Sequence, residues 1–150
     1  MADTKPRLAI WSCPKCGRLF SKRNQNHVHG RWTVEGHLDH KSPRVLELYS
    51  RFVQLISRCG PFEYAPVKSQ VGFRVNRIFA GVKLTGEGLD GYLDMDRAVR
   101  SPRFHHVAPY QRNLFVHHFS IREVKELDAQ FAGWVREAYA VRQGRHLMGS

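Results

Sequence analysis

The feature that most constrains the fold of this chain is a change in the spacing of its apolar residues. Val45, Leu48 and Phe52 begin a series at intervals of three and four residues, which places them on one face of a helix. Downstream, apolar and polar residues alternate over residues 71–75 and 80–84, a period of two that indicates half-buried strands. The sequence therefore predicts a helix followed by a sheet.

Local signals predict the ends of two helices. Ser42 can cap the free amides of the first helix, Pro43 is tolerated at its first position, and Cys59-Gly60-Pro61 ends it. A second helix is predicted to begin at Ser120-Ile121-Arg122-Glu123, where the serine and the glutamate fit a capping box. The apolar residues that follow at helical spacing are Val124, Leu127, Phe131, Trp134, Val135 and Ala138.

The strands are expected to lie between these two helices. Gly86-Glu87-Gly88 predicts the turn of a hairpin. Further strands are expected at residues 62–65, 89–95, 104–108 and 113–119. Strands grouped between two helices predict an α+β class, with an antiparallel sheet of five or six strands and both helices packed on one face. The other face is expected to stay open unless the N-terminal segment covers it.

The N-terminal segment carries a candidate metal site. Cys13 and Cys16 are separated by two residues and followed by a glycine, a pattern typical of a zinc knuckle. His27 and His29 lie at a distance that a short hairpin can bring back to the two cysteines. Residues two apart on an extended segment share a face, so both imidazoles can reach one ion. We therefore expect a closed, structural zinc site with ligands Cys13, Cys16, His27 and His29.

The fourth zinc ligand has alternatives, because His37 or His40 can replace His29. The first forty residues contain too few large apolar side chains to order themselves without a metal. The predicted organisation is a zinc knuckle and linker over residues 1–40, followed by an α+β body over residues 41–150.

The charge of the chain favours a polyanionic partner. The formal net charge is +11 and the isoelectric point is near 10.1. Each cation set against a phosphate releases counterions and adds affinity that does not depend on sequence. We expect a module that binds RNA or DNA with weak sequence preference, with Trp11 or Trp32 available to stack on a base. The candidate contacts are Lys15, Arg18, Lys22, Arg23 and Arg31 near the knuckle, and Arg100 and Arg103 beside the sheet.

Two other functional classes stay open. One is an adapter whose exposed sheet face docks another protein. The other is a metal-dependent nuclease or phosphoesterase, suggested by Glu35, His37, Asp39 and His40, although the asparagine and second histidine that such a nuclease needs do not follow at a suitable distance. The sequence leaves enzymatic activity open, favours a binding module over an enzyme, and assigns no catalytic residue.

Two histidine pairs also suggest a phosphoesterase, because a neutral imidazole can activate water: His105-His106 and His117-His118. Adjacent residues on a strand point to opposite faces, so at most one of each pair can share a site with another strand. We expect one histidine of each pair at the edge of the core and the other in solvent.

The cellular location follows from what the sequence lacks. It contains no run of eighteen apolar residues and no apolar signal-peptide core near Met1. With two of three cysteines assigned to zinc, an unpaired thiol fits a reducing compartment. We expect a cytoplasmic protein.

Motifs along almost the whole chain resemble those of an uncharacterised bacterial domain-of-unknown-function family with a zinc-knuckle-like N-terminus. The resemblance implies the knuckle followed by a helix-sheet-helix body, and it implies no activity. In that family the position of His29 is usually a cysteine, and an imidazole is an acceptable replacement on zinc. The residues that carry the resemblance are Trp11, Cys13 to Arg18, Phe20, Asn24, Gln25, His27, Cys59 to Pro61, Leu89 to Gly91, Val116 to Phe119, Glu126 to Asp128 and Trp134 to Tyr139.

Overall fold

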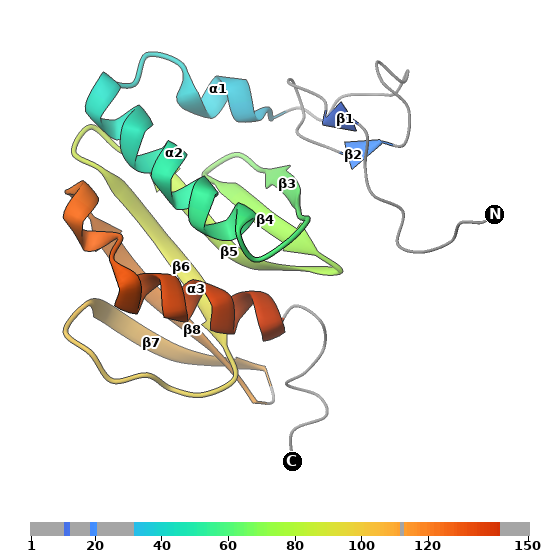
Figure 1. Cartoon of the computed structure of the whole chain (residues 1–150), viewed down its shortest axis with the longest axis vertical. Helices are drawn as coiled ribbons and strands as arrows, with labels where there is room; N and C mark the ends of the chain where they lie inside the picture. Colours follow the sequence, from blue (N-terminus) through green and yellow to red (C-terminus); the bar gives the residue numbers. More distant parts are fainter. Residues whose placement is uncertain (1–10, 13–18, 21–31, 112, 142–150) are drawn as a thin grey trace.

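A computed structural model describes residues 11–12, 19–20, 32–111 and 113–141 of the 150-residue chain. The predicted α+β class is confirmed, with helices flanking an antiparallel sheet (Figure 1). The elements in chain order are β1 (Trp11–Ser12), β2 (Leu19–Phe20), α1 (Val34–Leu38), α2 (Pro43–Ser57), β3 (Glu63–Pro66), β4 (Val71–Val75), β5 (Arg77–Leu84), β6 (Leu89–Met95), β7 (Phe104–Gln111), β8 (Leu114–Ile121), η1 (Val124–Glu126) and α3 (Ala129–Val141).

The main sheet has six described strands in the order β3-β4-β5-β6-β8-β7, and each neighbouring pair is antiparallel. The strands follow their order in the chain except at the end, where β8 pairs with β6 and β7 lies outside it as the edge strand. A separate ladder joins β1 to β2, with Trp11 opposite Phe20. The β6–β8 pairing is what brings the last third of the chain onto the sheet.

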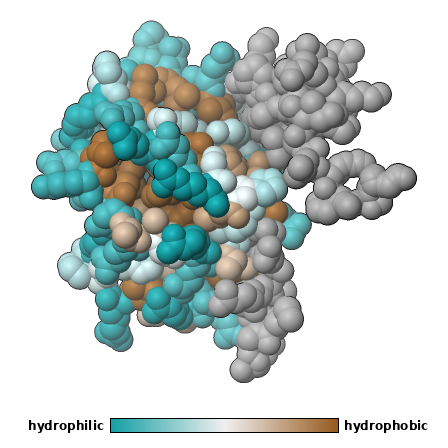
Figure 2. Space-filling model, in the orientation of Figure 1, coloured by the Kyte–Doolittle hydropathy of each residue, from teal (hydrophilic) through white to brown (hydrophobic). Residues whose placement is uncertain are grey.

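One face of the sheet packs against the helices. Helix α2 buries the apolar stripe predicted for it, and the ring of Phe52 lies 5.5 Å from that of Phe73 and 5.9 Å from that of Phe119, measured between centroids. Helix α3 adds Phe131, whose ring lies 5.0 Å from that of Phe119. Seen from this side, hydrophilic residues cover much of the surface and hydrophobic residues show between them (Figure 2).

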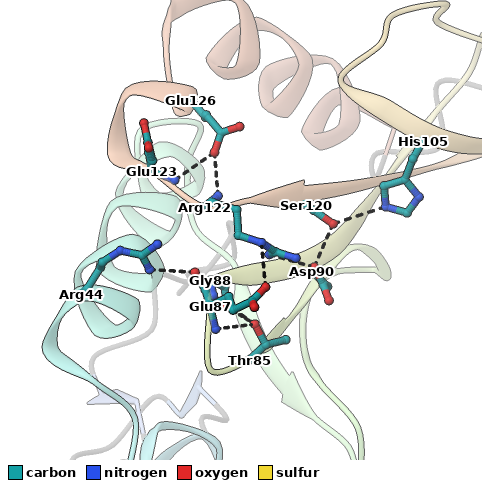
Figure 3. Close-up of polar contacts among 10 residues, drawn as sticks. All are labelled: Arg44, Thr85, Glu87, Gly88, Asp90, His105, Ser120, Arg122, Glu123 and Glu126. Atoms are coloured by element: carbon teal, nitrogen blue, oxygen red, sulfur yellow. Dashed lines mark hydrogen bonds and ion pairs between the residues drawn. The ribbon is translucent and has the colours of Figure 1, made fainter.

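The predicted start of α2 is confirmed. Ser42 caps the helix by accepting a hydrogen bond from the Val45 amide at 3.2 Å, and Pro43 occupies the first turn. The predicted turn between β5 and β6 is also present, because the Thr85 hydroxyl accepts from the Glu87 and Gly88 amides (Figure 3). A side-chain carbon at Gly88 would lie 2.0 Å from the Ile121 carbonyl oxygen, so the turn needs glycine there.

The predicted start of the last helix is wrong. Ser120 lies inside β8, opposite Asp90, and its hydroxyl donates to the Asp90 carboxylate at 2.9 Å instead of capping a helix. The reciprocal cap lies three residues later, where Glu126 accepts from the Glu123 amide in η1 (Figure 3). The start of α3 is set by Asp128, which accepts from the Phe131 amide at 3.0 Å. Strand pairing overrode the local capping signal.

The linker expected before residue 41 contains a short helix, α1. Thr33 caps it by accepting from the Gly36 amide at 3.0 Å, and Val34 and Leu38 pack against the core of the body. Among the described residues, no helix is long and apolar enough to cross a membrane.

Candidate functional site

The sheet face opposite the helices carries a polar surface built from three rows of cross-strand neighbours. Strand β6 supplies the middle of each row with Asp90, Tyr92 and Asp94, because the alternate residues Leu89 and Leu93 point into the core. We call this surface the open face, since no described helix lies on it. Its rows are Lys83, Asp90 and Ser120; Gly81, Tyr92, His118 and His106; and Asp94, Val116 and Ala108.

Two adjoining hollows cross the open face and share Gln70, Tyr92 and His118 in their walls. The larger has a volume of about 700 Å³. Its walls combine apolar and ring side chains with a few polar groups, the composition of a ligand-binding surface. The residues that line it are Gln70, Arg77, Ile78, Tyr92, Asp94, Tyr110, Val116 and His118.

Tyr92 forms the boundary between the two hollows. A side-chain carbon at Gly81 would lie 2.7 Å from the Tyr92 ring, so the absence of a side chain on β5 makes room for the ring against the strand. The Gln70 amide donates to the Tyr92 hydroxyl at 3.3 Å. Burial raises the pKa of Tyr92 to about 12, and the nearby Asp94 carboxylate adds to the effect. The phenol therefore stays protonated at neutral pH.

Asp94 is the buried acid of the open face. Only 3% of the residue is exposed, and Arg77 donates to its Oδ2 atom at 3.3 Å. Within the described part of the chain, Oδ1 has no hydrogen-bond partner. Burial raises the pKa of Asp94 to about 7, against the opposing charge of Arg77. The guanidinium of Arg77 also lies 5.9 Å from the centre of the exposed Tyr110 ring, so it connects the buried acid to the surface.

Three histidines gather beside Tyr92. The pair His117-His118 divides as expected: His117 is fully buried and accepts from the Val99 amide at 2.9 Å, while His118 lies on the open face. The pair His105-His106 does not follow the expected alternation. A register shift in β7 places both rings near His118, with centroids 6.4 and 5.4 Å away.

The surroundings of His118 favour its neutral form. Burial lowers the pKa of His118, and the charges of His106 and His105 lower it further. Across the described residues, no group of three or more His, Cys, Asp and Glu side chains has the arrangement needed to hold a metal ion.

A polar network closes one end of the open face (Figure 3). Arg122 donates to Asp90 at 3.2 Å and forms an ion pair with Glu87 at 3.5 Å. The Ser120 hydroxyl donates to Asp90 and lies 3.5 Å from His105 Nε2. In a serine hydrolase triad the imidazole lies between the serine and the carboxylate. Here Ser120 lies between His105 and Asp90, so Asp90 does not orient this imidazole as a base.

Most of the site residues predicted from the sequence lie outside the described residues. This applies to the proposed zinc ligands Cys13, Cys16, His27 and His29 and to the proposed contacts Lys15, Arg18, Lys22, Arg23 and Arg31. Of the two alternative fourth ligands, His37 lies with Nε2 2.6 Å from the Val67 carbonyl oxygen, and His40 forms an exposed ion pair with Asp39 at 3.4 Å.

The two predicted contacts in the body, Arg100 and Arg103, differ in their surroundings. Arg100 is exposed in the loop before β7. Arg103 is mostly covered, donates to both carboxylate oxygens of Asp128, and lies over the Phe131 and Trp134 rings at 5.7 and 5.6 Å. Its donors hold the loop before β7 against the start of α3, while its contact with nucleic acid stays a prediction.

The sequence reasoning missed Arg77, Tyr92 and Asp94. The alternation of Asp90, Tyr92 and Asp94 with apolar residues was a usable signal, since it places three polar side chains on one face of one strand. The partnership of Asp94 with Arg77 joins residues 17 apart in the chain and required the β5–β6 pairing to be known.

Comparison with known proteins adds one match. A family described as a domain of unknown function, DUF5655, matches residues 34–142. The matched segment spans α1 to α3 and begins after Cys13, Cys16, His27 and His29. No curated protein and no solved structure matches the chain.

Proposed function

The chain belongs to the DUF5655 family of unknown function, and we propose that it binds single-stranded RNA or DNA across the open face of its sheet. The observation that carries the proposal is the row of ring side chains Tyr92, His118 and His106 on three neighbouring strands, with the exposed ring of Tyr110 beside it. Bases of single strands stack on aromatic and imidazole faces presented by a sheet.

The spacing of these rings suits a chain of bases. The centroids of Tyr92 and His118 are 6.3 Å apart, and those of His106 and His118 are 5.4 Å apart. The rings belong to separate strands and are held by the sheet, so little side-chain freedom is lost when a base stacks on them. Lys83 lies exposed on the same face, where it can contact a phosphate.

The phosphate affinity comes mainly from the N-terminal segment in this proposal. Residues 1–31 contain seven Lys or Arg residues and one Asp, whereas residues 32–141 contain fifteen Lys or Arg and twelve Asp or Glu. Several arginines of the body are already paired with acids, among them Arg74 with Glu63 and Arg97 with Glu137. Unpaired cations release the most counterions on binding.

We propose that zinc orders this basic segment through Cys13, Cys16, His27 and His29. The pairing of β1 with β2 supports the knuckle, because it brings together the two ends of the segment that contains both cysteines. Two thiolates and two imidazoles complete a tetrahedral site, which has no open position for catalysis.

Fluorescence anisotropy with a labelled single-stranded 12-mer tests the proposal. We expect binding that weakens as salt rises. Tyr110→Ala and Lys83→Ala should each weaken it about three- to tenfold, whereas Arg51→Ala, on the exposed side of α2, should not. Absence of binding at physiological salt would refute the proposal. Capture of a protein partner that is insensitive to salt would instead support the adapter.

A further inference from the structure

Asp94 has an acceptor that the fold leaves unused. Only 3% of Asp94 is exposed, its Oδ2 atom accepts from Arg77, and its Oδ1 atom has no hydrogen-bond partner among the described residues. A buried polar atom without a hydrogen bond costs stability, and natural proteins rarely keep one without a reason. Above about pH 7 the carboxyl group of Asp94 is mainly ionised and only accepts hydrogen bonds, so the missing partner is then a donor.

The neighbours of Asp94 indicate the shape of that donor. The hollow that Asp94 lines has ring walls from Tyr92, Tyr110 and His118 and aliphatic walls from Ile78 and Val116. Its remaining polar groups are Gln70 and Arg77. Ring walls combined with a few polar groups fit a heteroaromatic ring that is apolar on its faces and polar on its edge, as a nucleobase is.

The depth of Oδ1 restricts which bases can reach it. Oδ1 is buried, so the donor must project beyond the outline of the ring. The exocyclic amino groups of cytosine, adenine and guanine project in this way. The ring N–H of uracil lies between two carbonyl oxygens, which project further and would meet the carboxylate first with like partial charge.

We propose that Asp94 accepts a hydrogen bond from the exocyclic amino group of a base seated between Tyr92, Tyr110 and His118. The open face then prefers cytosine, adenine or guanine to uracil. This inference depends on the proposed binding of single-stranded nucleic acid and adds base selection to it. It departs from the weak sequence preference expected from charge alone.

The test compares two oligonucleotides, dC12 and dU12, whose bases differ at C4, which carries an amino group in cytosine and a carbonyl in uracil, and at N3, which carries a proton only in uracil. At pH 8, where Asp94 is mainly ionised, wild-type protein should bind dC12 about tenfold more tightly than dU12, the discrimination expected for one hydrogen bond to a charged group. In the isosteric variant Asp94→Asn this ratio should fall to about one or reverse, because an amide can also donate. Glu47→Gln removes an exposed carboxylate from α2, on the other side of the sheet, and should keep the wild-type ratio.

The outcomes separate the inference from the function it depends on. Equal binding of dC12 and dU12 by the wild type would overturn the inference and leave nucleic-acid binding standing. A tenfold ratio that persists in a folded Asp94→Asn variant, judged by circular dichroism, would overturn the role of Asp94. Failure to bind either oligonucleotide would overturn both.

Discussion

The N-terminal segment, residues 1–31, and the body of this protein differ in the balance of their charged residues. The body, residues 32–141, has an aromatic core in which Phe52 contacts the rings of Phe73, Phe119 and Phe131, and its acidic and basic residues are nearly balanced. Residues 1–31 have seven basic residues against one acidic residue. The comparison teaches that the net charge of a strongly basic protein can be spread unevenly, with more than half of it in the first 31 residues.

The largest effect is expected from removing the centre of the body's core. Phe52 is fully buried, so Phe52→Ala should lower the free energy of unfolding by about 3–5 kcal/mol. Urea denaturation followed by circular dichroism measures this loss. A loss below 1 kcal/mol would contradict the view that the body is held by one core centred on this ring. The exposed Arg51→Ala on the same helix is the control.

We expect Asp94 to lower the stability of the body at neutral pH, because its ionised form is disfavoured by burial. Its pKa is raised to about 7 from 3.8, so the folded protein keeps this proton over a pH range in which the unfolded chain loses it. The contribution of Asp94 to stability is therefore complete below about pH 4 and is lost as pH rises to about 7, by roughly 4 kcal/mol at most.

Asp94→Asn isolates that contribution. The free energy of unfolding of the variant minus that of the wild type should be larger at pH 8 than at pH 4.5. Asparagine does not titrate, and the titration of all other groups cancels in this difference. Urea denaturation at both pH values measures it. If the two proteins keep a constant difference, Asp94 does not titrate in this range.

The charge difference between the two regions can be tested in the full chain. Replacing four basic residues of the N-terminal segment with glutamine should weaken binding to a single-stranded 12-mer about 100-fold and lower the slope of log affinity against log salt by about 3. The residues are Lys15, Arg18, Lys22 and Arg23.

A matched variant replaces four exposed cations of the body with glutamine and should weaken binding less than about threefold, because these cations lie off the open face. They are Arg51, Arg58, Lys125 and Arg136. Equal losses of affinity in the two variants would contradict the proposal that the N-terminal cations supply most of the affinity for phosphates.

The smallest effect on the body is expected from removing the metal. Wild-type protein should contain about one zinc ion per chain and Cys13→Ser should contain less, as measured by mass spectrometry of the metal. The melting temperature of the body should change by less than about 2 °C, because its core does not include the proposed ligands. A body that unfolds with the loss of zinc would show that the two regions fold as one.

Helices and turns that depend on residues close together in the sequence were predictable. Helix α2 was located by its apolar stripe, its Ser42 cap and its terminal glycine, all within eighteen residues of one another. The β5–β6 hairpin was located by its glycine turn. The zinc ligands remain a prediction from spacing alone.

Other features depended on contacts between distant residues. Ser120 has the local signature of a helix cap, but it extends β8 because β6 offers a partner in Asp90. The register shift that brings both His105 and His106 to His118 arises from the pairing of β7 with β8, and alternation along one strand cannot predict it.

Sequence alone determined the class of the fold, the start of α2 and the uneven placement of charge. Apolar periodicity and helix capping depend on residues close together in the chain, and net charge is a sum over residues. Only the tertiary structure decided which side chains meet on the open face. Arg77, Asp94 and His118 come from three strands, and their contact depends on strand order and register, which are set by burying the opposite face of the sheet against α2 and α3.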